Sequence, residues 1–151
     1  MMNINELKKH INNKSRLIGV DMGSKRVGLS ISDENRKIST PLKTINYENI
    51  HLLIVEIEKI IYENNIGGIV FGNPKNMDGT EGSSSQSVKD KIKLISEKIK
   101  IPLVLWDERL STVGAFNLSS QLDVNVTKRV KNIDKNAAAF ILQGALDFLN
   151  N

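Results

Sequence analysis

The chain has 151 residues, of which 40% are hydrophobic and 25% are charged, a composition typical of one globular domain. It contains no cysteine, which excludes disulfides, zinc–thiolate sites and thiol nucleophiles, and its 2 histidines lie far apart, which argues against a zinc site or a histidine-based triad. The net charge of +4 favours a polyanionic partner, and the absence of any apolar run of membrane length predicts a cytoplasmic protein with no membrane partner.

The chain starts with an extension, residues 1–15, ahead of a single domain that we place at 16–151. Apolar residues spaced three and four positions apart, behind an asparagine suited to an N-cap, predict a short helix over 4–12. The other side of this helix is basic at positions 8–10, so we interpret it as a solvated amphipathic lead-in.

A β-hairpin is predicted at 16–32. An apolar run at 16–21 ends on Asp21, glycine, serine and lysine form a turn, and a second β-rich run at 27–32 leads away. A carboxylate at the end of a buried strand is costly to desolvate unless it is paired or holds a metal. Three interpretations of Asp21 stay open: a Mg²⁺ ligand in a phosphodiester-cleaving site, part of a glycine hairpin that cradles a nucleotide phosphate, and an ordinary turn residue.

Hydrophobic periodicity and the positions of glycine and proline predict the remaining elements. We expect strands at 37–45, 69–72 and 103–106, helices at 48–63, 84–99, 111–121 and 134–149, and a long loop at 72–82. The segment 122–133 carries Lys128, Arg129 and Lys131 with little periodicity, so it is predicted to be a mobile basic loop.

This order of elements predicts an α/β domain in which a three-stranded meander is followed by two parallel strands with helical crossovers, giving a mixed sheet with helices on both faces. In such sheets the active crevice lies outside the carboxyl ends of the parallel strands. Asp21 ends the first strand and Asp107 and Glu108 end the last, so both groups reach the same rim. Asp134 begins the final helix, as a third acid of the site or only as a helix cap.

The chain thus offers three carboxylates from separate segments, no cysteine and only two histidines. Such a set of ligands suits Mg²⁺ or Mn²⁺. Two such ions can hydrolyse a phosphodiester bond. Nucleic-acid backbone would then contact the basic residues of the 122–133 loop and of the hairpin turn, Lys25 and Arg26. Arg109 either pins the end of its strand, which we favour because a guanidinium holds a carboxylate bidentately, or reaches the scissile phosphate.

Four blocks of the sequence resemble the signature blocks of the YqgF family. They are GVDMGSKRVGLSISD at 19–33, GNPKNMDGTEG at 72–82, DERLST at 107–112 and IDKNAAAFILQ at 133–143. Proteins of this family are RNase H-like and are known as pre-16S rRNA nucleases or as RuvC-like Holliday junction resolvases. The resemblance implies the strand order 3-2-1-4-5, divalent-metal nuclease chemistry and maturation of the 5′ end of 16S rRNA. It also implies that Asp21, Glu108 and Asp134 are the metal-binding acids.

One departure from the resolvases concerns the strand after the first helix, where RuvC-type enzymes carry an acid. Here that strand ends Val70-Phe71-Gly72-Asn73, so the second ligand would come from Glu108, which weakens the case for junction cleavage. The alternatives are a nuclease of branched DNA, a non-catalytic rRNA-binding assembly factor and an ATP-binding protein with an actin-like phosphate hairpin. The chain is short for the last of these. A pre-ribosomal particle is a further expected partner, and monomer and homodimer both stay open.

Overall fold

The computed structural model describes residues 2–74, 78, 80, 82–107 and 126–150, without the side chains of 126–135. In chain order the elements are α1 (Ile4–His10), β1 (Arg16–Met22), β2 (Arg26–Ser32), β3 (Ser39–Asn46), α2 (Ile50–Asn64), β4 (Ile66–Asn73), α3 (Ser83–Lys98), β5 (Leu103–Asp107) and α5 (Val126–Leu149). None of the helices in these ranges is both long enough and apolar enough to cross a membrane. The predicted helix at 111–121 and most of the 72–82 loop lie outside the described residues.

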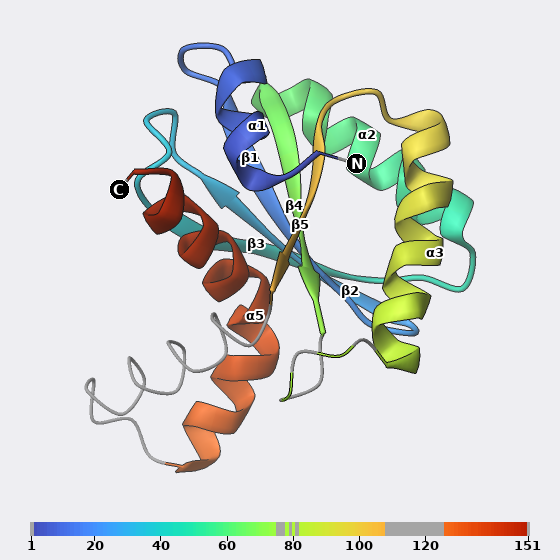
Figure 1. Cartoon of the computed structure of the whole chain (residues 1–151). Helices are drawn as coiled ribbons and strands as arrows, with labels where there is room; N and C mark the ends of the chain where they lie inside the picture. The colour runs from blue at the N-terminus through green and yellow to red at the C-terminus, as the bar shows by residue number, and fades with distance from the viewer. Residues whose placement is uncertain (1, 75–77, 79, 81, 108–125, 151) are drawn as a thin grey trace.

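The strands form one sheet in the order β3-β2-β1-β4-β5, which confirms the expected RNase H-like order. β1, β2 and β3 are antiparallel neighbours, whereas β4 and β5 run parallel to β1. Figure 1 shows α1 and α5 on one face of the sheet and α2 and α3 on the other, as a mixed sheet with helical crossovers requires.

Two hydrophobic cores hold the layers together. Side chains of a strand point alternately to the two faces of its sheet. Ile18 and Val20 of β1 therefore join the core under α2 and α3, while Leu17 joins the core under α1 and α5. Both faces of β1 are thus covered, which explains its unbroken apolar sequence.

Helix α1 belongs to the second core, so the interpretation of it as a solvated lead-in is wrong. Leu7 is fully buried against Leu17 and the apolar stripe of α5. The helix is capped by Asn3, whose side chain accepts a hydrogen bond from the Glu6 N–H at 2.9 Å. The Nζ of Lys8 donates to the carbonyl of Leu149 at 3.1 Å and ties α1 to the end of α5.

Truncation of Leu7 tests this assignment. Leu7→Ala should lower the free energy of unfolding by about 2–5 kcal/mol, because it empties a fully enclosed site. Chemical denaturation measures the change. Leu52, which is 64% exposed on α2, provides the matched control, and Leu52→Ala should change stability by no more than about 0.5 kcal/mol. If both variants changed the free energy of unfolding by the same small amount, α1 would be a solvated helix outside the core, as first predicted.

Strand β4 begins at Ile66, earlier than the predicted 69–72 strand. Asn65 ends α2 in the left-handed conformation with φ 54°, which turns the chain directly into the strand. Gly67 and Gly68 lie within β4, and a side chain at either position would collide with its neighbours, which accounts for glycine there. A Cβ on Gly68 would lie 2.8 Å from Leu7 of α1.

Helix α5 begins at Val126, so the prediction of a mobile loop at 122–133 is wrong over 126–133. Apolar residues at 126, 130 and 133 are spaced four and three positions apart, and no glycine or proline interrupts them, so the helix continues. Asp134 consequently lies inside α5 rather than at its start, and its interpretation as a helix cap is also wrong.

Candidate functional site at the carboxyl ends of the parallel strands

Asp21 lies near the end of β1, at the rim where the parallel strands finish. It is half-buried and pairs across the hairpin with Gly28. The turn beyond it is closed by a hydrogen bond from the Gly23 N–H to the Arg26 carbonyl at 2.8 Å. The rim therefore presents the carboxylate from the end of a paired strand rather than from a loop.

Tyr47, which follows β3, holds this turn from the side. Its N–H donates to the carbonyl of Lys25 at 2.9 Å, and its hydroxyl donates to the carbonyl of Gly23, also at 2.9 Å. Lys25 and Arg26 are exposed on the turn that these bonds fix. The two predicted substrate-binding cations thus lie at the rim beside Asp21.

The register of the sheet decides which acid shares a face with Asp21. Val20 of β1 aligns with Phe71 of β4, and Phe71 aligns with Leu105 of β5. Asp21 and Trp106 each follow one of these aligned residues, so their side chains point to the same face of the sheet. Trp106 packs edge-to-face on Phe148 of α5, with ring centroids 5.8 Å apart, so this is the α5 face.

Asp107 lies on the opposite face of the sheet. It aligns with Asn73, and the Oδ1 of Asn73 accepts a hydrogen bond of 2.5 Å from the Ser85 hydroxyl of α3. Asp107 therefore belongs to the α3 side and does not join Asp21 on the α5 side. Of the predicted rim pair Asp107 and Glu108, the second lies outside the described residues, as does Arg109.

Helix α5 approaches the strand that carries Asp21 unusually closely. A Cβ on Gly19 would lie 2.7 Å from the Leu142 Cβ and 2.8 Å from the Ala138 carbonyl oxygen, so only glycine permits this packing. The hydroxyl of Ser30, which is fully buried, donates to the Ala138 carbonyl at 2.7 Å. Together they anchor α5 to the β1–β2 hairpin.

Asp134 precedes Ala138 by four residues in α5. Four residues of helix rise about 6 Å, one turn. The end of α5 lies near α1, where Lys8 contacts Leu149, so the helix runs away from the rim and its earlier turns lie nearer to it. The backbone at Asp134 is therefore displaced from Ala138 toward the end of β1.

A shallow pocket of about 320 Å³ adjoins Asp21. Its lining comes from the hairpin, from the start of the loop after β4 and from α3: Asp21, Met22, Gly23, Ser24, Pro74, Ser84, Ser87, Val88 and Lys91. The Nζ of Lys91 donates to the Gly23 carbonyl at 3.3 Å and lies 5.8 Å from the centre of the Tyr47 ring. The pocket thus brings three hydroxyls and a cation to the α3 side of the rim, next to the strand end that carries Asp21.

Lys91 was not among the site residues predicted from the sequence. The available signal was its position three residues after buried Val88, beside the apolar stripe. Lys91 is half-buried, whereas Lys93 and Lys98 are exposed.

The three predicted acids do not form a cluster among the side chains that the structure describes, where no group of three metal-ligating residues occurs. Asp21 alone of the three is described in full. Asp134, like the basic residues Lys128, Arg129 and Lys131, is placed by its helix backbone. The assembly of a metal site from these acids stays a prediction.

Comparisons with known proteins agree with the fold. Relatives named "Putative pre-16S rRNA nuclease" include one from Pelagibacter ubique, 64% identical over 151 residues and 100% of both chains. Another, from Rhodobacter capsulatus, is 42% identical over 88% of this chain and 84% of its own. Thermus thermophilus RuvC in complex with a Holliday junction substrate superposes with a TM-score of 0.59 at 9% identity, covering 90% of this chain and 94% of its own.

A family model described as RuvX, Holliday junction resolvase, matches residues 15–148. The RuvC likeness, at so low an identity, supports the fold alone, whereas the family match and the full-length relative concern the sequence itself. The resemblance to the YqgF family is therefore confirmed, and the chain belongs to the RuvX/YqgF family.

Proposed function

We propose that this protein is a divalent-metal-dependent nuclease that hydrolyses phosphodiester bonds in structured RNA and matures the 5′ end of 16S rRNA. The full-length relative of 64% identity, whose name refers to pre-16S rRNA, carries the proposal. The half-buried Asp21 at the rim, beside a pocket with a lysine and three serines, supports it. Such a substrate would place the protein in the cytoplasm, with a pre-ribosomal particle as its partner.

Mg²⁺ or Mn²⁺ is the proposed cofactor. Asp21 fits a hard cation, because its carboxylate offers the oxygen donors that such an ion prefers, and neither thiol nor imidazole is among the described residues that line the adjoining pocket. Asp21 would hold the metal together with Glu108 and Asp134. A pair of such ions, when bound, activates water and stabilises the leaving oxygen of a phosphodiester.

The surrounding cations would bind the substrate backbone. Lys91, held toward the pocket by the Gly23 carbonyl, would contact a phosphate next to the scissile bond, with the hydroxyls of Ser84 and Ser87 as further donors. Lys25 and Arg26 would extend this surface along the hairpin turn. The residues Arg109, Lys128, Arg129 and Lys131 complete the proposed substrate-binding set.

Substitution of Lys91 tests the phosphate contact. Lys91→Ala should weaken binding of a precursor 16S fragment and flatten the log–log salt dependence of binding by about 0.7–0.9, because one phosphate contact is lost. Anisotropy titrations at several salt concentrations measure this. Lys98→Ala removes the same charge from an exposed position of α3 outside the pocket and should leave the slope unchanged. If the two variants behave alike, Lys91 serves only to hold the hairpin.

A second candidate substrate is branched DNA, which the description of the matching family model favours. The deciding experiment incubates the protein with a precursor 16S fragment and, separately, with a four-way DNA junction, each with Mg²⁺ or Mn²⁺. Site-specific cleavage of the RNA is the expected result. Cleavage of the junction alone would identify a resolvase, and binding without cleavage of either would identify a non-catalytic assembly factor.

A further inference from the structure

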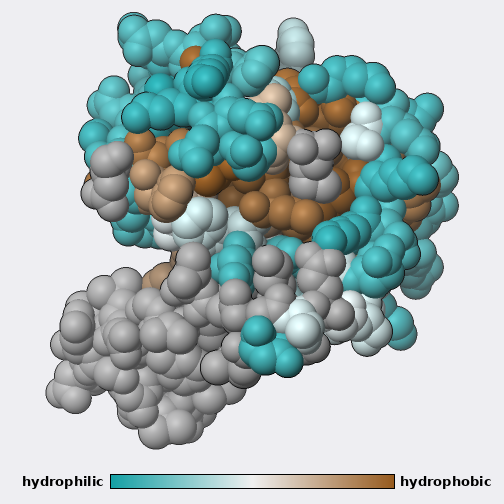
Figure 2. Space-filling view, in the orientation of Figure 1, coloured by the Kyte–Doolittle hydropathy of each residue, from teal (hydrophilic) through white to brown (hydrophobic). Residues whose placement is uncertain are grey.

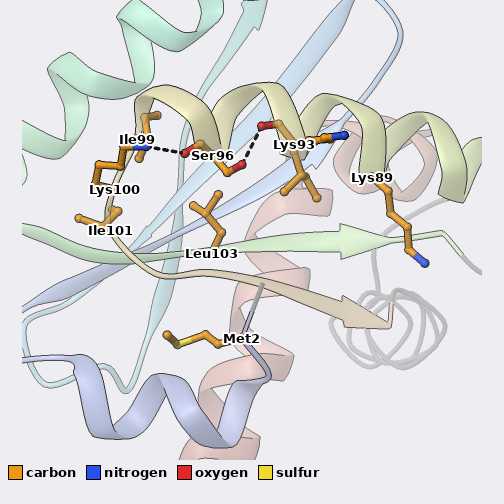
Figure 3. Close-up of a pocket in the computed structure, with 9 residues that line it drawn as sticks. Met2, Lys89, Lys93, Ser96, Ile99, Lys100, Ile101 and Leu103 are labelled. Atoms are coloured by element: carbon orange, nitrogen blue, oxygen red, sulfur yellow. Dashed lines mark hydrogen bonds between the residues drawn. The ribbon is translucent and has the colours of Figure 1, made fainter.

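A second hollow lies away from Asp21, beside the edge strand β5. β5 ends the sheet on the side opposite β3, and Met2 pairs with Val104 in a parallel bridge, outside the named strands. Between this N-terminal segment and α3 lies a groove of about 460 Å³, drawn in Figure 3. Its lining is Met2, Lys89, Ile92, Lys93, Ser96, Ile99, Lys100, Ile101 and Leu103. Ligand pockets span roughly 300–1,000 Å³, so the groove is large enough to bind a ligand.

The floor of the groove is aliphatic. Ile92, Ile99 and Leu103 belong to the core beneath α3, and Ile101 is half-buried at the turn into β5. In Figure 3 the side chains of Met2 and Leu103 lie across the space from α3. Figure 2 shows hydrophobic surface on this side of the molecule, bordered by hydrophilic side chains.

The walls of the groove are basic. Lys89 and Lys93 project from α3 and Lys100 follows its end, as Figure 3 shows. No acidic side chain is among the described residues that line it. Lys93 and Lys100 are exposed, and the Nζ of Lys100 donates to the Ser96 carbonyl of its own segment at 3.4 Å.

This combination does not suit a nucleic acid. Single-stranded nucleic acids stack their bases on aromatic side chains, and none of the described side chains that line the groove is aromatic. A phosphate backbone gains nothing from an aliphatic floor, whereas aliphatic side chains of a peptide do. Carboxylates flanking those side chains would meet the lysines, which gives charge complementarity at the rim of the interface.

We propose that the groove binds an acidic segment of a partner protein, with aliphatic side chains seated on Ile99, Ile101 and Leu103 and with carboxylates paired to Lys93 and Lys100. The bridge between Met2 and Val104 already occupies the outer edge of β5 at that position, so the partner segment would lie between the N-terminal segment and α3 rather than pair with β5. The proposal concerns a surface separate from the Asp21 pocket and does not depend on the nuclease activity.

Selection from a random peptide library on the full-length protein tests the proposal, followed by anisotropy titration of the enriched peptides. We expect enrichment of sequences that combine Asp or Glu with Leu, Ile or Val. The double variant Lys93→Glu with Lys100→Glu should weaken their binding about tenfold or more, because two attractive pairs become repulsive. The control, Lys59→Glu with Lys98→Glu, makes the same change of charge at exposed positions outside the groove and should bind like the wild type.

A further variant, Ile101→Glu, places a carboxylate on the floor and should abolish binding, with melting curves showing that it folds. The proposal is overturned if no peptide class is enriched, if basic sequences are enriched, or if the control variant loses as much affinity as the groove variant. Titration with single-stranded RNA separates the two ligand classes. An RNA affinity lowered in the groove variant and not in the control would assign the groove to nucleic acid and reject the proposal.

Discussion

Replacing Asp21 by asparagine should lower the rate of RNA hydrolysis by about a thousandfold or more, while the protein folds and binds substrate as before. Asparagine keeps the shape of the side chain but removes the negative charge that would hold the cation. Loss of that cation removes several kcal/mol of transition-state stabilisation, and about 4 kcal/mol corresponds to a thousandfold in rate. Single-turnover cleavage of a precursor 16S fragment in Mg²⁺ measures the effect.

A second readout for Asp21 does not depend on the substrate. Mg²⁺ at ten times its Kd should stabilise the wild type by about 1.4 kcal/mol, because it binds the folded state only. Asp21→Asn should gain much less in the same melting experiment. Asp147→Asn makes the same chemical change at an exposed position of α5 and should cleave and respond to Mg²⁺ like the wild type. Wild-type cleavage by Asp21→Asn would rule out metal catalysis through this residue.

Gly19→Ala should destabilise the protein by about 1–3 kcal/mol, the usual cost of overpacking a core. The added methyl would lie within 2.8 Å of both the Leu142 Cβ and the Ala138 carbonyl oxygen, and also too close to the Ser30 hydroxyl. Two of these atoms belong to helix α5, which would have to move away from β1. Because Asp134 lies one turn from Ala138, we also expect cleavage to fall more than stability alone explains.

Gly28 provides the control for Gly19, since it lies on the neighbouring strand of the same hairpin. A Cβ there would meet the Ala138 Cβ at 3.7 Å and the Asp21 Cβ at 3.8 Å, which are ordinary contacts. Gly28→Ala should therefore change the free energy of unfolding by no more than about 0.5 kcal/mol, as chemical denaturation measures. If both variants are equally stable, close packing of α5 on β1 does not hold the site together.

Local sequence patterns were sufficient to predict much of this fold. The run that ends on Asp21 predicted a hairpin with a carboxylate at the rim, and the periodicity of 48–63 and 84–99 predicted α2 and α3 within a residue or two of their bounds. The four motif blocks predicted the family and the strand order. These features could be predicted because neighbouring residues dictate them, through alternation in strands and through the spacing of apolar residues in helices.

Other features depend on contacts between distant segments. Gly67 and Gly68 look like a loop in the sequence, yet they lie in β4, where Ser15 and Leu7 occupy the space that side chains would need. The first turns of α5 look like a basic loop, yet a helix already formed extends cheaply, one hydrogen bond per residue. The first error needed long-range contacts to resolve, whereas the helical spacing of the apolar residues at 126, 130 and 133 was already present in the sequence.

The sequence by itself predicted that Asp21 and Asp107 lie at the same end of a mixed sheet, because the carboxyl ends of parallel strands share a rim. The tertiary structure alone decided whether they share a face. Side chains alternate along β5, so Asp107 and Trp106 point to opposite faces of the sheet. Trp106 packs on α5, which assigns Asp107 to the α3 side, away from Asp21. Lys91 likewise became a candidate only when α3 was placed against the hairpin, because the Gly23 carbonyl that holds its Nζ lies 68 positions earlier in the chain.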